Sequence, residues 1–90
     1  MALTVWKFAL KIADVQGIDM PVDAKILAVQ VQRGTPCLWA LVNKTGIIPE
    51  RRTFAIYGTG HPIPDEPGTH IGTFQVDGGT LVFHVFEVKE

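Results

Sequence analysis

Residues 69–88 have the pattern of a β-hairpin. Two apolar-rich runs flank the turn sequence Asp77-Gly78-Gly79. Two consecutive glycines favour a two-residue hairpin loop, because both central residues of such a turn have positive φ angles. A Gly78-Gly79 loop places Val76 opposite Leu81 and fixes the register of the two strands. The hairpin therefore restricts the chain to folds built on antiparallel strands.

Five further strand-like runs precede the hairpin, at residues 4–12, 15–20, 25–32, 37–42 and 52–57. The first alternates apolar residues with Lys7 and Lys11, which is typical of a half-buried strand. The run 25–32 fits a helix capped by Asp23 as well, but its β-branched residues favour a strand. The run 37–42 is apolar on both faces, as in a central strand.

Seven short strands separated by turns predict a single all-β domain over residues 1–90. The architecture expected is a small antiparallel β-sandwich or a partly open β-barrel. A chain of 90 residues buries a modest core, and partners often add stability at this size. Its one cysteine, Cys37, excludes an internal disulfide and indicates a reducing compartment.

The hairpin register predicts two faces of different character. The face expected to join the core carries Phe74, Val76, Leu81, Phe83 and Val85. The opposite face has apolar and polar residues mixed, with Thr73 opposite His84 and His70 opposite Glu87: its candidate interface residues are Ile71, Val82, His84, Phe86 and Val88. Either the chain's own loops cover this face or another subunit does. We favour a homo-oligomer, because so short a chain has few elements left for a covering layer.

The Gly58-Thr59-Gly60-His61 segment is the main candidate for ligand binding. Glycines allow successive backbone N–H groups to converge on an anion, and Thr59 and His61 add polar side chains. Arg51 and Arg52 would supply positive charge if the fold brings them near. The alternative is a tight turn with an exposed histidine, since the segment is neither a P-loop nor a dinucleotide-binding motif.

Catalytic and metal chemistry find little support in the residues. The three histidines and Cys37 have no recognised metal-ligand spacing, so no metal or other cofactor is expected. Asp65 and Glu66 lie in a proline-rich stretch that reads as a solvated turn. We therefore expect a protein that is not an enzyme.

Nucleic-acid binding is also disfavoured at this level. Arg33, Lys44 and the Arg51-Arg52 pair form a small basic set, and Trp6, Trp39 and Tyr57 are possible stacking platforms. However, both tryptophans are expected in the core, and the net charge is −1. The N-terminal residues lack a signal-peptide pattern, and no run reaches the roughly 20 apolar residues of a membrane span. A cytoplasmic protein is expected.

Several segments resemble a family of small uncharacterised proteins encoded by bacteriophages and prophages. The segments that carry the resemblance are residues 6–8, 24–27, 29–32, 36–42, 57–63, 71–75 and 78–84. The family has no assigned activity, so the resemblance transfers no functional residues. It implies an accessory protein that acts in the host cytoplasm by binding, either blocking a host protein or sequestering a signalling nucleotide of antiviral defence. A structural protein of the virion and a single-strand nucleic-acid binder are the alternatives.

Overall fold

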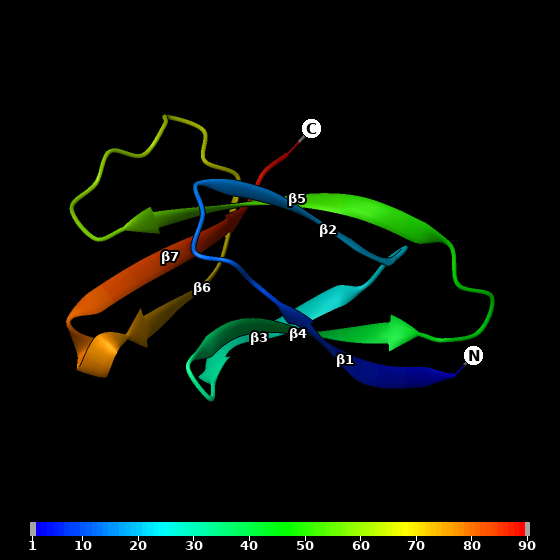
Figure 1. The fold of residues 1–90 in the computed structure, drawn as a ribbon. Coiled ribbons are helices and arrows are strands. Elements are labelled where there is room, and N and C mark those ends of the chain that lie inside the picture. The colour runs from blue at the N-terminus through cyan, green and yellow to red at the C-terminus, as the bar shows by residue number, and fades with distance from the viewer. Residues whose placement is uncertain (1, 90) are drawn as a thin grey trace.

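Strands make up most of residues 2–89, the part of the chain that the computed structural model describes (Figure 1). Over this range there are seven: β1 (Leu3–Ala9), β2 (Val15–Pro21), β3 (Lys25–Gln32), β4 (Thr35–Asn43), β5 (Pro49–Gly58), β6 (Thr69–Val76) and β7 (Leu81–Glu87). Each predicted strand is present, although the first ends at Ala9 instead of residue 12, and the 25–32 run is a strand rather than a helix. No helix among these residues has the length and hydropathy of a membrane span.

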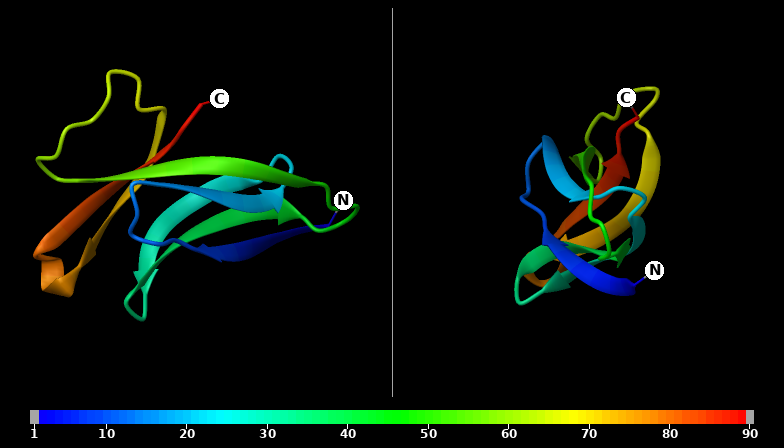
Figure 2. Two further views of the ribbon diagram at one scale, coloured as in Figure 1. Left: turned by 45° about the horizontal axis from the view of Figure 1, so that its top comes forward. Right: turned by 90° about the vertical axis from the view of Figure 1, so that its right-hand side faces the viewer.

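The strands form two antiparallel sheets that lie in two layers (Figures 1 and 2). One sheet has the order β1-β4-β3 and the other the order β2-β5-β7-β6. The molecule is flattened, with extents of 42 × 31 × 16 Å. The expected all-β class is confirmed, and the two separate sheets make it a small β-sandwich.

The core lies between the two layers and uses alternate residues of the central strands. Leu38, Ala40 and Val42 point inward from β4, and Phe54 and Val85 meet them from the four-stranded sheet; each is at most 1% exposed. Because alternate residues of a strand face opposite sides, the remaining residues of these strands form the two outer faces of the sandwich. Any binding surface on a sheet must therefore use those outer residues.

The β6–β7 hairpin turns at the glycines that its sequence predicts, but through a short 3₁₀ element, η1 (Asp77–Gly79). Gly78 and Gly79 have φ angles of 65° and 90°, as in a type I′ turn over residues 77–80, and the N–H of Thr80 donates to the carbonyl oxygen of Asp77 at 3.2 Å. Asp77 also has a positive φ, 54°, and Thr80 is helical, so four residues and not two separate the paired strands. Val76 pairs with Leu81, which confirms the predicted register at this end of the hairpin.

A register shift farther along the hairpin corrects part of the predicted outer face. The pairing slips by one residue between His70 and Gly72, so that His70 pairs with Phe86 instead of Glu87. The extra residue is Ile71, which packs against the core instead of joining the outer face. A bulge reverses the facing of the residues beyond it, because side chains alternate with a period of two. Ile71 therefore does not belong to the predicted interface.

The two sheets approach closely along one side of the sandwich, where β6 meets β3. A Cβ atom on Gly72 would lie 3.0 Å from Cβ and Cγ2 of Val29. This position leaves little space for a side chain, and glycine allows the backbone of β6 to lie against the valine. The four-stranded sheet therefore packs against the three-stranded sheet through β6 and β3, although these two strands are not hydrogen-bonded neighbours.

Three predicted core positions are less buried than the alternation implies. Leu81 is 48% exposed at the end of the hairpin, and Trp6 is 37% exposed on the edge strand β1. Trp39 is half-buried and lies on the outer face of its sheet, opposite Lys7. The expectation that both tryptophans sit in the core is therefore wrong, because it could not take account of edge position or of which face of β4 points inward.

Candidate functional site

The Gly58–His61 segment forms a tight turn at the end of β5. The N–H of His61 donates to the carbonyl oxygen of Gly58 at 3.0 Å, and Gly60 has a φ of 87°. The N–H of Thr59 donates to the carbonyl oxygen of Val82 at 3.1 Å. Two of the N–H groups that an anion cradle would need are thus directed at the chain itself. This geometry corresponds to the tight-turn alternative of the sequence analysis.

The hollow beside this turn is mainly apolar. Its volume is about 510 Å³, and its lining includes Ile56, Tyr57 and Phe83 together with His61 and Asp14. The His61 ring folds back over Gly58, where an added Cβ atom would lie 3.0 Å from it. A carboxylate and apolar walls suit an anion poorly. The surroundings of the turn therefore favour an apolar contact over a phosphate.

Arg51 and Arg52 lie at the opposite end of the same strand. Arg52 and Gly58 are six residues apart on β5, which separates them by about 20 Å at about 3.3 Å per residue. Each arginine has an acidic partner: Arg51 binds Asp19 at 3.1 Å, and Arg52 binds Glu87 at 2.6 Å. The fold does not join the two arginines with the Gly58–His61 turn into one site.

Arg52 links three elements at one end of the sandwich. Its guanidinium donates to both carboxylate oxygens of Glu87 on β7, at 2.6 and 2.8 Å, and to the carbonyl oxygen of Ala24 before β3. The hydrogen bond that Arg52 donates to Glu87 raises the pKa of Arg52, and partial burial offsets part of that rise. An arginine is already charged at neutral pH, and these contacts tie β5 to β7 and to Ala24.

His84 is held by threonine hydroxyls on the outer face of the four-stranded sheet. Its Nε2 lies 2.7 Å from Oγ1 of Thr59, and its Nδ1 lies 2.9 Å from Oγ1 of Thr73. The predicted Thr73–His84 pair is thus confirmed. The same hydroxyl of Thr73 is 3.3 Å from Nε2 of His70. These contacts fix the imidazole ring in one orientation across β5, β7 and β6.

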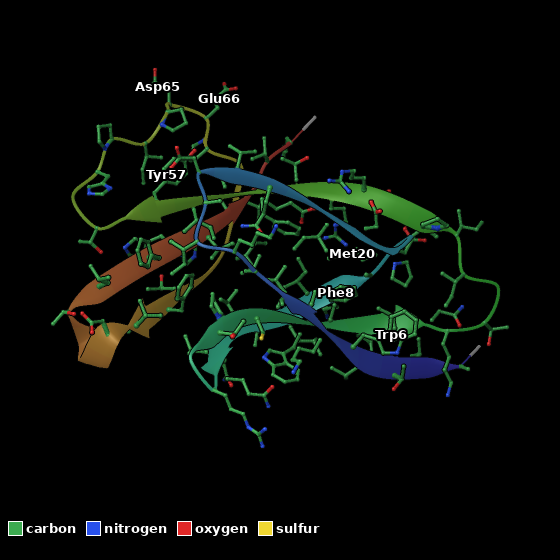
Figure 3. All side chains as sticks on the ribbon, in the orientation of Figure 1. Trp6, Phe8, Met20, Tyr57, Asp65 and Glu66 are labelled. Atoms are coloured by element: carbon green, nitrogen blue, oxygen red, sulfur yellow. The ribbon has the colours of Figure 1, made fainter. Side chains whose placement is uncertain are left out.

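Aromatic rings lie directly beside His84 on this face. Phe86 is in edge-to-face contact with Tyr57 at 5.8 Å and with His70 at 5.2 Å. Figure 3 shows Tyr57 on the side of β5 that faces the 59–68 loop. Val82, on the same side of β7, is half-buried, and so is Val88, just beyond the strand. We call this set the aromatic face, defined by Tyr57, His70, Thr73, Val82, His84, Phe86 and Val88.

The remaining reactive side chains lie apart from one another. Cys37 is 2% exposed, with its Sγ 3.4 Å from the carbonyl oxygen of Thr35. Asp65 and Glu66 are exposed and project from the outer loop (Figure 3). Residues 2–89 contain no cluster of three or more histidine, cysteine, aspartate or glutamate side chains that would hold a metal ion. Among the predicted interface residues, His84 and Phe86 therefore stand out, because each contacts two neighbouring side chains on the aromatic face.

Comparison with known proteins assigns a family but no activity. Neither the curated proteins nor the solved structures contain a significant match. One family model, described as a domain of unknown function (DUF7352), matches residues 1–90. Because this match spans the whole sequence, the chain belongs to the DUF7352 family.

Proposed function

We propose that the protein is a non-enzymatic binding module that recognises another protein through its aromatic face. The observation that carries the proposal is the fixed position of His84 between Thr59 and Thr73, with Phe86 held between two rings beside it. Rigid side chains lose little conformational entropy when a partner covers them. A preorganised aromatic surface is therefore suited to binding.

The composition of the aromatic face supports a protein partner. Tyrosine and phenylalanine are enriched at protein interfaces, because a large apolar ring gives much contact area at little entropic cost. Histidine and threonine add hydrogen-bonding groups around the rings. Both ring nitrogens of His84 already have hydroxyl partners, which favours a positioning role over proton abstraction.

A second copy of this chain is the partner we place first. A symmetric dimer covers the same patch on both molecules, and such dimers are the most common oligomers. The resemblance to phage-encoded proteins supplies a second partner class, a host defence protein that the bound module blocks. Sequestration of a signalling nucleotide at the Gly58–His61 turn receives less support, since that turn binds its own N–H groups internally.

Sedimentation velocity over a range from micromolar to near-millimolar protein tests the proposal. We expect wild type to self-associate and Phe86→Lys to remain monomeric, because a buried unpaired charge opposes the interface. Leu27→Lys is the matched control: Leu27 is 50% exposed on the other sheet, so this variant should associate like wild type. Circular dichroism checks that all three are folded.

Two results would count against self-association through this face. A wild-type monomer at every concentration would reject the second copy as partner, and equal association of wild type and Phe86→Lys would reject the face. If the partner is a host defence protein, expression of wild type, but not of Phe86→Lys, should restore phage plaque formation on a host that carries the defence. High copy number in purified virions would instead favour the structural alternative.

A further inference from the structure

The small net charge of the chain conceals a separation of charge between its two sheets. Residues 1–13 and 24–49 contain five cationic side chains and not one aspartate or glutamate: Lys7, Lys11, Lys25, Arg33 and Lys44. All nine carboxylate side chains lie in the remaining residues, together with Arg51, Arg52 and Lys89. The three-stranded sheet, with its adjoining turns, is built from the acid-free segments. Its side of the sandwich is therefore basic.

An aromatic ring lies in the middle of this basic face. Trp39 on the central strand β4 pairs with Lys7 on β1 and with Ala28 on β3, so its ring stands on the outer surface between two edge strands. The ammonium group of Lys7 lies 5.8 Å from the centre of the Trp39 ring. The ring is half-buried and its Nε1 is fully buried, so a flat group that stacks on Trp39 takes the place of the Lys7 side chain over the ring.

A hollow of about 460 Å³ lies beside Lys7, the residue whose ammonium group is over the Trp39 ring. Its lining includes Lys7, Gln32, Arg33 and Thr35. The Lys7 ammonium now donates to the Gln32 side-chain oxygen at 2.7 Å in an exposed hydrogen bond. Two cations, an amide and a hydroxyl around one depression, with no carboxylate nearby in the sequence, suit a phosphate group.

We propose that this outer face binds single-stranded nucleic acid. A backbone phosphate occupies the hollow between Lys7 and Arg33, and the neighbouring base stacks on Trp39. A single strand is the form expected, because a duplex keeps its bases stacked inside and away from a flat sheet. Lys25, farther along the outer face, extends the basic track. The aromatic face belongs to the other sheet, so this site does not depend on the proposed protein interface.

Fluorescence anisotropy with a labelled twelve-nucleotide oligothymidylate tests the site. We expect binding that weakens steeply between about 50 mM and about 200 mM NaCl, and weaker binding of a duplex of equal length. The double variant Lys7→Gln with Arg33→Gln should lose about tenfold in affinity and lower the salt dependence by about 0.7, the value for one lost phosphate contact on a single strand. Arg51→Gln with Lys89→Gln is the control, because it removes the same charge from the other sheet.

Tryptophan fluorescence tests the stacking step separately. Trp6→Phe leaves Trp39 as the sole tryptophan, and we expect the oligothymidylate to quench it. The affinity of Trp6→Phe for the oligothymidylate should equal that of wild type, because Trp6 points to the inner side of β1.

Four outcomes would overturn the proposal. These are no anisotropy change at low salt, equal losses in the two double variants, binding without quenching of Trp39, and a salt-sensitive self-association in which the basic face meets the acidic half of a second copy. The last outcome would assign the charge separation to assembly.

Discussion

Arg51 and Arg52 show how adjacent residues of one type acquire different roles on a strand. Arg51 pairs with Asp19 near the solvent, and their side chains are 66% and 64% exposed. Arg52 faces the other side of β5 and pairs with Glu87, with exposures of 16% and 24%. Exposed ion pairs contribute little to stability, whereas a partly buried pair leaves an unsatisfied charge when one member is removed.

Replacing Arg52 by glutamine should destabilise the protein by about 1–3 kcal/mol, because Glu87 and the Ala24 carbonyl lose their donor. Arg51→Gln should change the free energy of unfolding by less than about 0.5 kcal/mol. Because the pKa of Arg52 is raised above its ordinary value, the contribution of its charge is complete below that ordinary value and is lost as pH rises through the folded-state pKa, in strong alkali. Protonation of Glu87 in acid also removes the pair. Urea titrations at neutral and mildly alkaline pH measure the free energy of unfolding of both variants. Equal destabilisation by Arg52→Gln and Arg51→Gln would contradict the prediction.

Gly68 and Gly60 predict a second contrast at the residue scale. Both have positive φ angles, 98° and 87°. A Cβ atom on Gly68 would overlap the carbonyl oxygen of Glu87, while nothing lies within 4 Å of one on Gly60. Gly60→Ala should therefore cost about 1 kcal/mol from backbone strain alone, and Gly68→Ala about 2–4 kcal/mol. Thermal unfolding compares them, and similar melting temperatures would refute the steric argument.

At the scale of elements, the sequence specified strand positions better than strand facing. Alternation and β-branched residues located all seven strands, and the glycine pair located the hairpin turn. The bulge at Ile71 was not predicted, because no local pattern marks it; beside it, Gly72 packs closely against Val29 on another strand. Three of the outer-face residues of β7 were found correctly, but their partner Tyr57 was missed because the β5–β7 pairing joins strands that are not neighbours in sequence.

Two substitutions at Gly78 test the type I′ assignment of the β6–β7 turn, because one should stabilise the protein and the other should destabilise it. Gly78→Asn should stabilise the protein by about 0.5 kcal/mol, since asparagine tolerates a φ of 65° and restricts the unfolded chain. Gly78→Val should destabilise it by about 1–2 kcal/mol, because a β-branched residue resists the left-handed region. Chemical denaturation measures both changes, and a stabilising valine would exclude this turn type.

At the scale of the whole molecule, the arrangement of charge matters more than its sum. A net charge of −1 suggested no attraction to polyanions, yet the acid-free segments fold into one sheet. The absence of aspartate and glutamate from two stretches of the sequence was a visible signal. Its meaning depended on β1, β3 and β4 being neighbours, since only then do the cations share a face.

Heparin affinity at a pH above the sequence pI of 6.3 tests this charge separation independently of nucleic acid. We expect wild type to be retained at low salt although its net charge is negative, because the basic face presents locally high positive charge. Lys7→Gln with Arg33→Gln should elute earlier than Arg51→Gln with Lys89→Gln. Passage of wild type in the void at low salt would refute a functional basic face.

The sequence by itself determined the elements of this protein. Periodicity, turn glycines and β-branched residues act locally, so they set seven strands and a type I′ hairpin. Only the tertiary structure decided which residues meet. Arg52 lies far from the Gly58–His61 turn, Ile71 packs against the core, and Trp39 lies beside Lys7. Local patterns did not show these placements, because they depend on how strands pair and pack in space.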